Sequence, residues 1–91
     1  METIISRTAI DNQLCRLEQE CQKSEDQTAI WVYYAISRYI LTSRAPVEFL
    51  RVFINCNPRR FPTLIKRCRN AADNSDQGMI QTTKKFLKIG E

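Results

Sequence analysis

Residues 29–36 read Ala-Ile-Trp-Val-Tyr-Tyr-Ala-Ile, and this unbroken apolar and aromatic stretch decides the fold class. Consecutive side chains of a helix point about 100° apart, so this stretch would present apolar groups in nearly every direction around the helix axis. Ser24 and Gln27 precede it with the spacing of a capping box, which marks the start of a helix. We therefore predict a helix over residues 25–42 that is the central and most buried one.

The three tyrosines of this segment, Tyr33, Tyr34 and Tyr39, carry hydroxyl groups that need water or a hydrogen-bond partner. We expect them at the rim of the core, and a stacking platform for nucleic-acid bases is the alternative interpretation. Arg38 marks the solvent-facing edge of the helix, because it is the only charged residue of the segment after Asp26.

The segment is not predicted to cross a membrane. The run from Ala29 to Leu41 contains Ser37 and Arg38 and is shorter than the ~18 residues that a membrane span needs. The first residues, Met-Glu-Thr-Ile-Ile-Ser, lack the basic region and long apolar run of a secretory signal. We therefore expect an intracellular protein in a reducing compartment, without a membrane partner.

A narrow apolar stripe runs along the segment before the central helix. Its members fall within about 60° of one another on a helix and are Ile10, Leu14, Leu17 and Cys21. Thr8 and Asp11 have capping-box spacing, so we predict a helix over residues 8–22. The stripe resembles a coiled-coil seam but lasts for about two heptads only, which leaves open whether it packs within the chain or forms a homodimer seam.

Three more helices are predicted after the central one, over residues 46–56, 61–72 and 76–88. Pro46 suits the first turn of a helix. Pro58 and Pro62 prevent the helix over 46–56 from continuing into the helix over 61–72. The helix over 61–72 has one apolar face, made of Phe61, Leu64, Ile65, Cys68, Ala71 and Ala72. With 91 residues, two glycines and three prolines, the chain favours a single all-α domain, a compact bundle of about five short helices.

The four cysteines, Cys15, Cys21, Cys56 and Cys68, form no C-x-x-C pair, and the chain contains no histidine. In a reducing compartment we interpret them as small apolar packing residues. A zinc site of four thiolates that are brought together by the fold is the alternative. We expect neither a metal site nor a cofactor.

The sequence argues against an enzyme. Histidine is the commonest general base and metal ligand, and it is absent. Gly78 and Gly90 are too few and too far apart for a glycine-rich phosphate loop. Cys68 stands between Arg67 and Arg69, but its place on an apolar helix face predicts a buried, unreactive thiol.

Positive charge is concentrated in the second half of the chain. Residues 1–45 contain five Lys or Arg and six Asp or Glu, whereas residues 46–91 contain nine and four. No acid lies between Glu48 and Asp73, and that segment carries six basic residues. The sequence therefore predicts a local basic surface.

We expect this surface to bind nucleic acid, because clustered basic side chains neutralise phosphates and release their counterions. The helices over 46–56 and 61–72 could form a helix-turn-helix, in which Thr63, Lys66, Arg67 and Asn70 would face the bases. The complete candidate interface is Arg59, Arg60, Thr63, Lys66, Arg67, Arg69 and Asn70, with a secondary basic patch at Lys84, Lys85 and Lys88. The connection between the two helices contains no glycine and is long for this motif.

The alternative is a protein-interaction module, such as an adaptor or inhibitor. It would bind an acidic partner through the basic face or self-associate through the helix over 8–22. The charges are also compatible with solubility alone. Insertion into a membrane surface is disfavoured, because the helix over 61–72 offers no large exposed apolar side chains.

Overall fold

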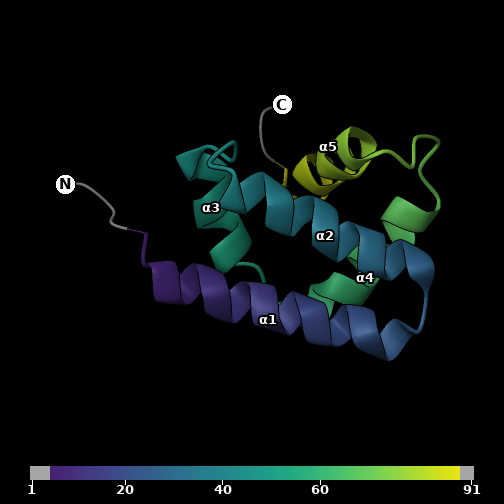
Figure 1. The fold of residues 1–91 in the computed structure, drawn as a ribbon, viewed down its shortest axis with the longest axis horizontal. Coiled ribbons are helices and arrows are strands. Elements are labelled where there is room, and N and C mark those ends of the chain that lie inside the picture. Colours follow the sequence, from purple (N-terminus) through teal and green to yellow (C-terminus); the bar gives the residue numbers. More distant parts are fainter. Residues whose placement is uncertain (1–4, 89–91) are drawn as a thin grey trace.

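Helix α2 (Gln27–Leu41) lies at the centre of the fold in the computed structural model, which describes residues 5–88. It packs against α1 (Arg7–Ser24) on one side and against α5 (Asp76–Leu87) on the other, as Figure 1 shows. Helix α4 (Phe61–Arg69) contacts all three of these helices, and α3 (Val47–Ile54) packs on α1 and α5. The radius of gyration is 12.3 Å, close to the roughly 12 Å expected for a compact chain of this length.

The prediction of an all-α bundle is confirmed. Residues 5–88 form five α-helices and the 3₁₀ turn η1 (Pro58–Arg60), and no strand occurs among them. The predicted helices over 25–42, 46–56 and 76–88 differ from the observed ones by at most two residues at either end. The helix predicted over 8–22 also differs from α1 by at most two residues at either end, whereas the helix predicted over 61–72 ends three residues early.

The starts of α1 and α2 were predicted at the wrong residues. Ser6, and not Thr8, caps α1, because its side chain accepts a hydrogen bond from the backbone N–H of Ala9. Ser24 belongs to the end of α1, and Asp26 caps α2 by accepting from the N–H of Thr28 at 2.8 Å. Glu25 separates the two helices because its left-handed backbone (φ 50°) cannot continue α1.

Helix α4 begins as predicted but ends three residues early, at Arg69. Asn57 starts the approach to it, since its side chain accepts a hydrogen bond from the N–H of Arg59 at 3.0 Å and initiates η1. The chain then continues directly into α4 through Phe61, which is fully buried. Ala72 consequently lies outside the packing face and is exposed, contrary to the prediction.

A row of aromatic rings joins α2, α3 and α4 inside the core. Tyr39 meets the ring of Phe49 edge-on at 5.1 Å, and Phe49 and Phe61 each stack on Phe53 at 6.1 Å. Such aromatic pairs contribute about 0.5–1.5 kcal/mol beyond the area that they bury. The row fixes the position of α3 and of the amino end of α4.

Gln13 is the one polar residue of α1 that is fully enclosed among the described residues. Its amide donates hydrogen bonds to the carbonyl oxygens of Phe53 and Cys56, at 2.8 and 2.7 Å. These carbonyls lie at the end of α3, where a helix has acceptors without intrahelical partners. Gln13 of α1 thus provides hydrogen-bond donors for the carbonyl oxygens at the end of α3. The residues next to Gln13 in the sequence do not reveal this role.

The interpretation of the α1 stripe as a homodimer seam is corrected by the structure. Its four residues, Ile10, Leu14, Leu17 and Cys21, are each no more than 8% exposed and belong to the core of one chain. Helices α2, α3 and α4 pack on α1 and cover this face. A second chain cannot reach the stripe while the bundle is closed.

The expectation that α2 would be enclosed on all sides is wrong for one face. Ile30, Tyr34 and Leu41 are four and seven residues apart, so they lie on one side of the helix, and Trp31 lies beside them. Their exposed fractions are 41% to 55%. No helix of the described chain covers this face, which we call the apolar face of α2.

Three of the cysteines pack as predicted, and one does not. Cys21, Cys56 and Cys68 are buried, whereas Cys15 is exposed on α1. Burial raises the pKa of the Cys21 thiol to about 12 and that of the Cys68 thiol to about 11. Both thiols therefore stay protonated at neutral pH, which agrees with a packing role for them.

Candidate nucleic-acid interface on helices α4 and α5

All seven residues of the predicted interface are exposed. They are Arg59, Arg60, Thr63, Lys66, Arg67, Arg69 and Asn70. The opposite face of α4 is anchored by Phe61, Leu64, Ile65 and Cys68, each at most 2% exposed. Thr63, Lys66, Arg67 and Arg69 are therefore held on a packed helix, whereas Arg59 and Arg60 lie in η1 and Asn70 directly follows α4.

These residues nevertheless face in three directions. Thr63, Lys66 and Asn70 are three and four residues apart and share the outermost side of α4. Arg60 and Arg67 turn toward α5, where both approach the ring of Phe86. Arg69 turns toward the start of α2 and forms an ion pair with Asp26.

Phe86 organises the side of α4 that faces α5. The guanidinium carbon of Arg60 lies 4.4 Å from the centroid of the Phe86 ring, and that of Arg67 lies 5.5 Å from it. Cation–π contacts of this kind hold a guanidinium by its flat face and leave its N–H groups at the edge available to a ligand. The two arginines are thus positioned together without being neutralised.

Arg60 also lies at the carboxyl end of α5. Its Nη2 atom donates a long hydrogen bond of 3.5 Å to the backbone carbonyl of Phe86. A cation at this end of a helix is stabilised by the helix dipole. The sequence alone does not reveal this role of Phe86, because its contact with residues 60 and 67 depends on how α4 and α5 meet.

A hollow between the end of α4 and α5 extends this side of the surface. Its volume is about 550 Å³, and Arg67 and Lys85 contribute the positive charges of its lining. Gly78 allows the α4–α5 connection to lie close to α5, since a Cβ atom there would collide with Asp73. The close approach brings the end of α4 next to the middle of α5.

Asp73 is the acidic member of this lining. A hydrogen bond from the Ser75 side chain, together with one from the Ser75 backbone, lowers the pKa of its carboxyl group. The group is therefore charged at neutral pH and offsets one of the two cations.

The predicted secondary patch of Lys84, Lys85 and Lys88 does not form one surface. Lys85 lies beside Arg67, whereas Lys84 lies on the other side of α5, with its Nζ atom 5.4 Å from the ring of Tyr39. Lys88 ends the helix in a left-handed conformation, with φ 60°. Only Lys85 therefore joins the candidate interface on α4.

We use the name α4–α5 basic surface for Arg59, Arg60, Lys66, Arg67 and Lys85. Within residues 5–88 none of these five forms an ion pair with a carboxylate, in contrast to Arg69. Their positive charge is consequently available to an anionic partner.

The arrangement of α3 and α4 differs from the expected helix-turn-helix. Six residues, including η1, separate Ile54 from Phe61, and α3 packs on α1 and α5 more than on α4. The two helices are linked by the stacked rings of Phe53 and Phe61. Helix α4 is exposed along its polar side, as a recognition helix would be, but α3 does not accompany it in the usual way.

Comparison of the chain with protein-family models, with curated proteins and with solved structures gave no match. Within residues 5–88 no three cysteine, aspartate or glutamate residues are grouped so that they could hold a metal ion. In the same part of the chain, no helix combines the length and the apolar character needed to cross a bilayer.

Proposed function

We propose that the protein binds nucleic acid through the α4–α5 basic surface, mainly by contacts with phosphates. The observation that carries the proposal is the pair Arg60 and Arg67, both held against the ring of Phe86 with no carboxylate paired to them among residues 5–88. Two guanidinium groups fixed in this way suit successive phosphates, because each can donate two parallel hydrogen bonds.

The shape of the surface favours recognition of the backbone over recognition of sequence. Helix α4 has nine residues and is therefore about 13.5 Å long, so that it spans only about four base pairs at ~3.4 Å each. Thr63 and Asn70 are its exposed hydrogen-bonding side chains without charge. Direct base contacts would thus be few, and most of the binding free energy would come from released counterions.

The proposal is tested by the salt dependence of binding to a fluorescent single-stranded RNA and to a double-stranded DNA. We expect measurable binding at ~50 mM salt and a linear loss of log affinity with log salt concentration. Arg67→Gln and Lys85→Gln should each reduce the magnitude of that slope by about 1 for the duplex. The absence of a complex with either nucleic acid at ~50 mM salt would refute the proposal.

Arg7→Gln serves as the matched control for Arg67→Gln, since it removes the same charge. Arg7 is exposed at the start of α1, far from α4 in Figure 1. The control should leave the slope unchanged within error. Equal effects of the two variants would mean that binding follows net charge and not the α4–α5 basic surface.

A second candidate function, the binding of an acidic protein, is favoured by the apolar face of α2. Exposed side chains of this size on one helix face are typical of interaction surfaces, and Trp and Tyr are common among their energetic centres. The chain has a net charge of +4, and Arg38, on the same side of α2, is 64% exposed although it is paired with Asp76. These charges complement an acidic helical segment that has an apolar face of its own.

The two candidate functions predict that different substitutions abolish binding. A protein held by the apolar face of α2 should be retained from host extract at ~0.5 M salt, where phosphate contacts are weakened, and should be lost with Trp31→Ala combined with Tyr34→Ala. Arg67→Gln should not affect it. If the partner still binds the double variant, or no longer binds the Arg67→Gln variant, the apolar face of α2 is not its binding site.

A further inference from the structure

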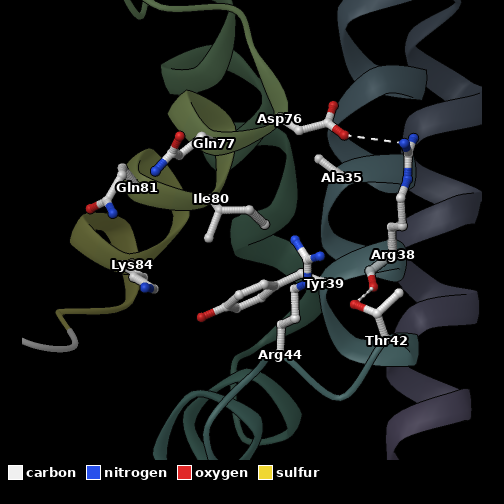
Figure 2. A pocket seen from close by; sticks show the side chains of 10 residues that line it. All are labelled: Ala35, Arg38, Tyr39, Thr42, Arg44, Asp76, Gln77, Ile80, Gln81 and Lys84. Carbon is white, nitrogen blue, oxygen red and sulfur yellow. Dashed lines mark hydrogen bonds and ion pairs between the residues drawn. The ribbon is translucent and has the colours of Figure 1, made fainter.

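A groove between the carboxyl half of α2 and the outer side of α5 adjoins the hollow beside the α4–α5 basic surface, and the two share Gln77 and Gln81. Its volume is about 460 Å³, within the ~300–1,000 Å³ range of pockets that bind small molecules. Figure 2 shows Arg38, Tyr39 and Arg44 on one wall and Gln77, Gln81 and Lys84 on the other. Sequence analysis did not identify this groove, because its two walls come from segments about 40 positions apart in the chain.

The groove has an excess of positive charge. Arg38 is paired with the carboxylate of Asp76 at 3.3 Å, and the dashed line between these two side chains in Figure 2 marks the pair. Asp76 is the sole acid of the lining, and no ion pair of Arg44 or Lys84 with a carboxylate occurs within residues 5–88. Two cations on opposite walls therefore remain available to an anion between them.

The positions of these groups are set by the backbone and by packing. The N–H groups of Arg44 and Ala45 both donate to the carbonyl oxygen of Tyr39, each at 3.2 Å, after Ser43 has reversed the chain with φ 60°. The Tyr39 ring is held edge-on by Phe49, and Lys84 lies 5.4 Å from its centroid. The backbone of the groove and its Tyr39 wall are thus preformed, which reduces the entropy lost on binding, whereas the Arg44 side chain is exposed.

The rest of the lining suits an uncharged organic part of the ligand. Ala35 and Ile80 are buried apolar residues, and the Tyr39 ring adds a flat surface beside them. Gln77 and Gln81 are one helical turn apart on α5 and provide amide donors and acceptors. A bare phosphate ion would use the two cations but would leave this part of the groove empty.

We propose that the groove binds a phosphate monoester of a small ring-containing molecule, of the mononucleotide class. Arg44 and Lys84 hold the phosphate from opposite walls, and the ring lies against Tyr39, Ala35 and Ile80. This site does not depend on the proposed nucleic-acid binding. Lys84 and Lys85 are adjacent in sequence but point about 100° apart on α5, so that Lys84 lines this groove and Lys85 lines the neighbouring hollow.

Titration calorimetry with adenosine monophosphate, adenosine and inorganic phosphate tests the proposal. We expect the monophosphate to bind with a Kd below ~1 mM, and adenosine and inorganic phosphate to bind at least about tenfold more weakly. No heat of binding at several millimolar monophosphate would overturn the site. Equal affinity for adenosine would overturn the role of the cations, and equal affinity for inorganic phosphate would overturn the role of the ring.

Three variants locate the site, with Lys85→Gln as the matched control for Lys84→Gln. Arg44→Gln and Lys84→Gln should each weaken binding of the monophosphate by about tenfold or more, because each removes a charge-assisted hydrogen bond. Lys85→Gln should leave it within about twofold. Equal losses in Lys84→Gln and Lys85→Gln would show diffuse attraction and refute the groove as the site.

The same variants separate this proposal from nucleic-acid binding. Lys84→Gln should retain the salt slope for duplex DNA, and Lys85→Gln should reduce it. Thermal unfolding of each variant checks that the fold is intact, and Arg44, which lies on an exposed loop, provides a test that does not alter any helix.

Discussion

Helices α4 and α2 both pack against α1 and α5, but their apolar residues are distributed differently around the helix axis. Helix α4 alternates apolar and charged residues at helical spacing, and four of the six residues predicted for its apolar face, Phe61, Leu64, Ile65 and Cys68, are buried. The other two, Ala71 and Ala72, lie beyond its end. Helix α2 is apolar around most of its circumference, yet Ile30, Trp31, Tyr34 and Leu41 are exposed. An amphipathic pattern thus determines which side of a helix packs, whereas a uniformly apolar one does not.

The neighbours of α2 explain the difference. Helices α1, α4 and α5 cover its other sides and leave one without a partner. A five-helix chain has too few elements to surround a central helix completely, because its surface is large relative to its volume. Large apolar side chains can therefore lie on the surface of α2 while the smaller Ala29 and Ala35 are buried in it.

The largest expected contrast is in thiol reactivity, and it tests whether the apolar face of α4 is closed. Iodoacetamide at pH 8 should alkylate Cys15 at least about a thousandfold faster than Cys68. Cys68 is fully buried, its pKa is raised to about 11, and it reacts only after an opening that costs about 5 kcal/mol or more. Peptide mapping by mass spectrometry after timed quenching gives both rates. Similar rates would show that α4 is not firmly packed.

A matched pair of leucine substitutions compares the two helices directly. Leu64→Ala in α4 should reduce the free energy of unfolding by about 2–5 kcal/mol, since it leaves a cavity in the core. Leu41→Ala in α2 should change it by no more than about 0.5 kcal/mol, because this side chain is 55% exposed. Urea denaturation measures both. A large loss for Leu41→Ala would mean that another molecule covers the apolar face of α2 in solution.

The buried thiol of α4 also predicts a pH dependence of stability. The pKa of Cys68 rises from its ordinary value of 9.0 to about 11 on folding, because burial disfavours the thiolate. The unfolded chain therefore ionises first, and stability that is complete below pH 9 falls as the pH approaches 11, by about 1.4 kcal/mol per pH unit for this thiol. Urea midpoints between pH 8 and 10.5 measure the fall. A Cys68→Ala variant should show a smaller fall over the same range.

The smallest effects concern the contact between the start of α2 and the end of α4. Asp26→Ala removes both the cap of α2 and the ion pair with Arg69, and should cost about 1–2 kcal/mol. Arg69→Ala removes the ion pair alone and should cost less than about 1 kcal/mol. At ~0.5 M salt the cost of Arg69→Ala should vanish and most of that of Asp26→Ala should remain. Equal costs in high salt would contradict the capping role of Asp26.

Much of the fold follows from local patterns. Proline positions and helical periodicity predicted five helices, and the polar side of α4 is exposed at each residue proposed for binding. The start of α1 was misjudged because several residues in this region can cap a helix, and local spacing does not choose between Ser6 and Thr8. The stripe of Leu14 and Leu17 had the spacing of a dimer seam, but the intrachain core uses the same spacing.

The candidate sites depended more on tertiary structure. A basic segment was evident in the sequence, but the approach of Arg60 and Arg67 to Phe86 requires α4 and α5 to meet. The division of Lys84 from Lys85 follows from the different neighbours on the two sides of α5. Nothing in the sequence indicated a binding role for Arg44, since it is an isolated basic residue in a loop.

The sequence by itself determined that this chain forms helices, which side of α4 packs, and that positive charge gathers in its second half. Only the tertiary structure decided which side of α2 is left exposed, which of the basic residues lie toward α5, and that Arg44 and Lys84 line the same groove. The physical reason is the distance along the chain over which each kind of interaction acts. Periodicity, capping and backbone restriction act over a few neighbouring residues, whereas a surface or a groove is made by segments that only the packing of the core brings together.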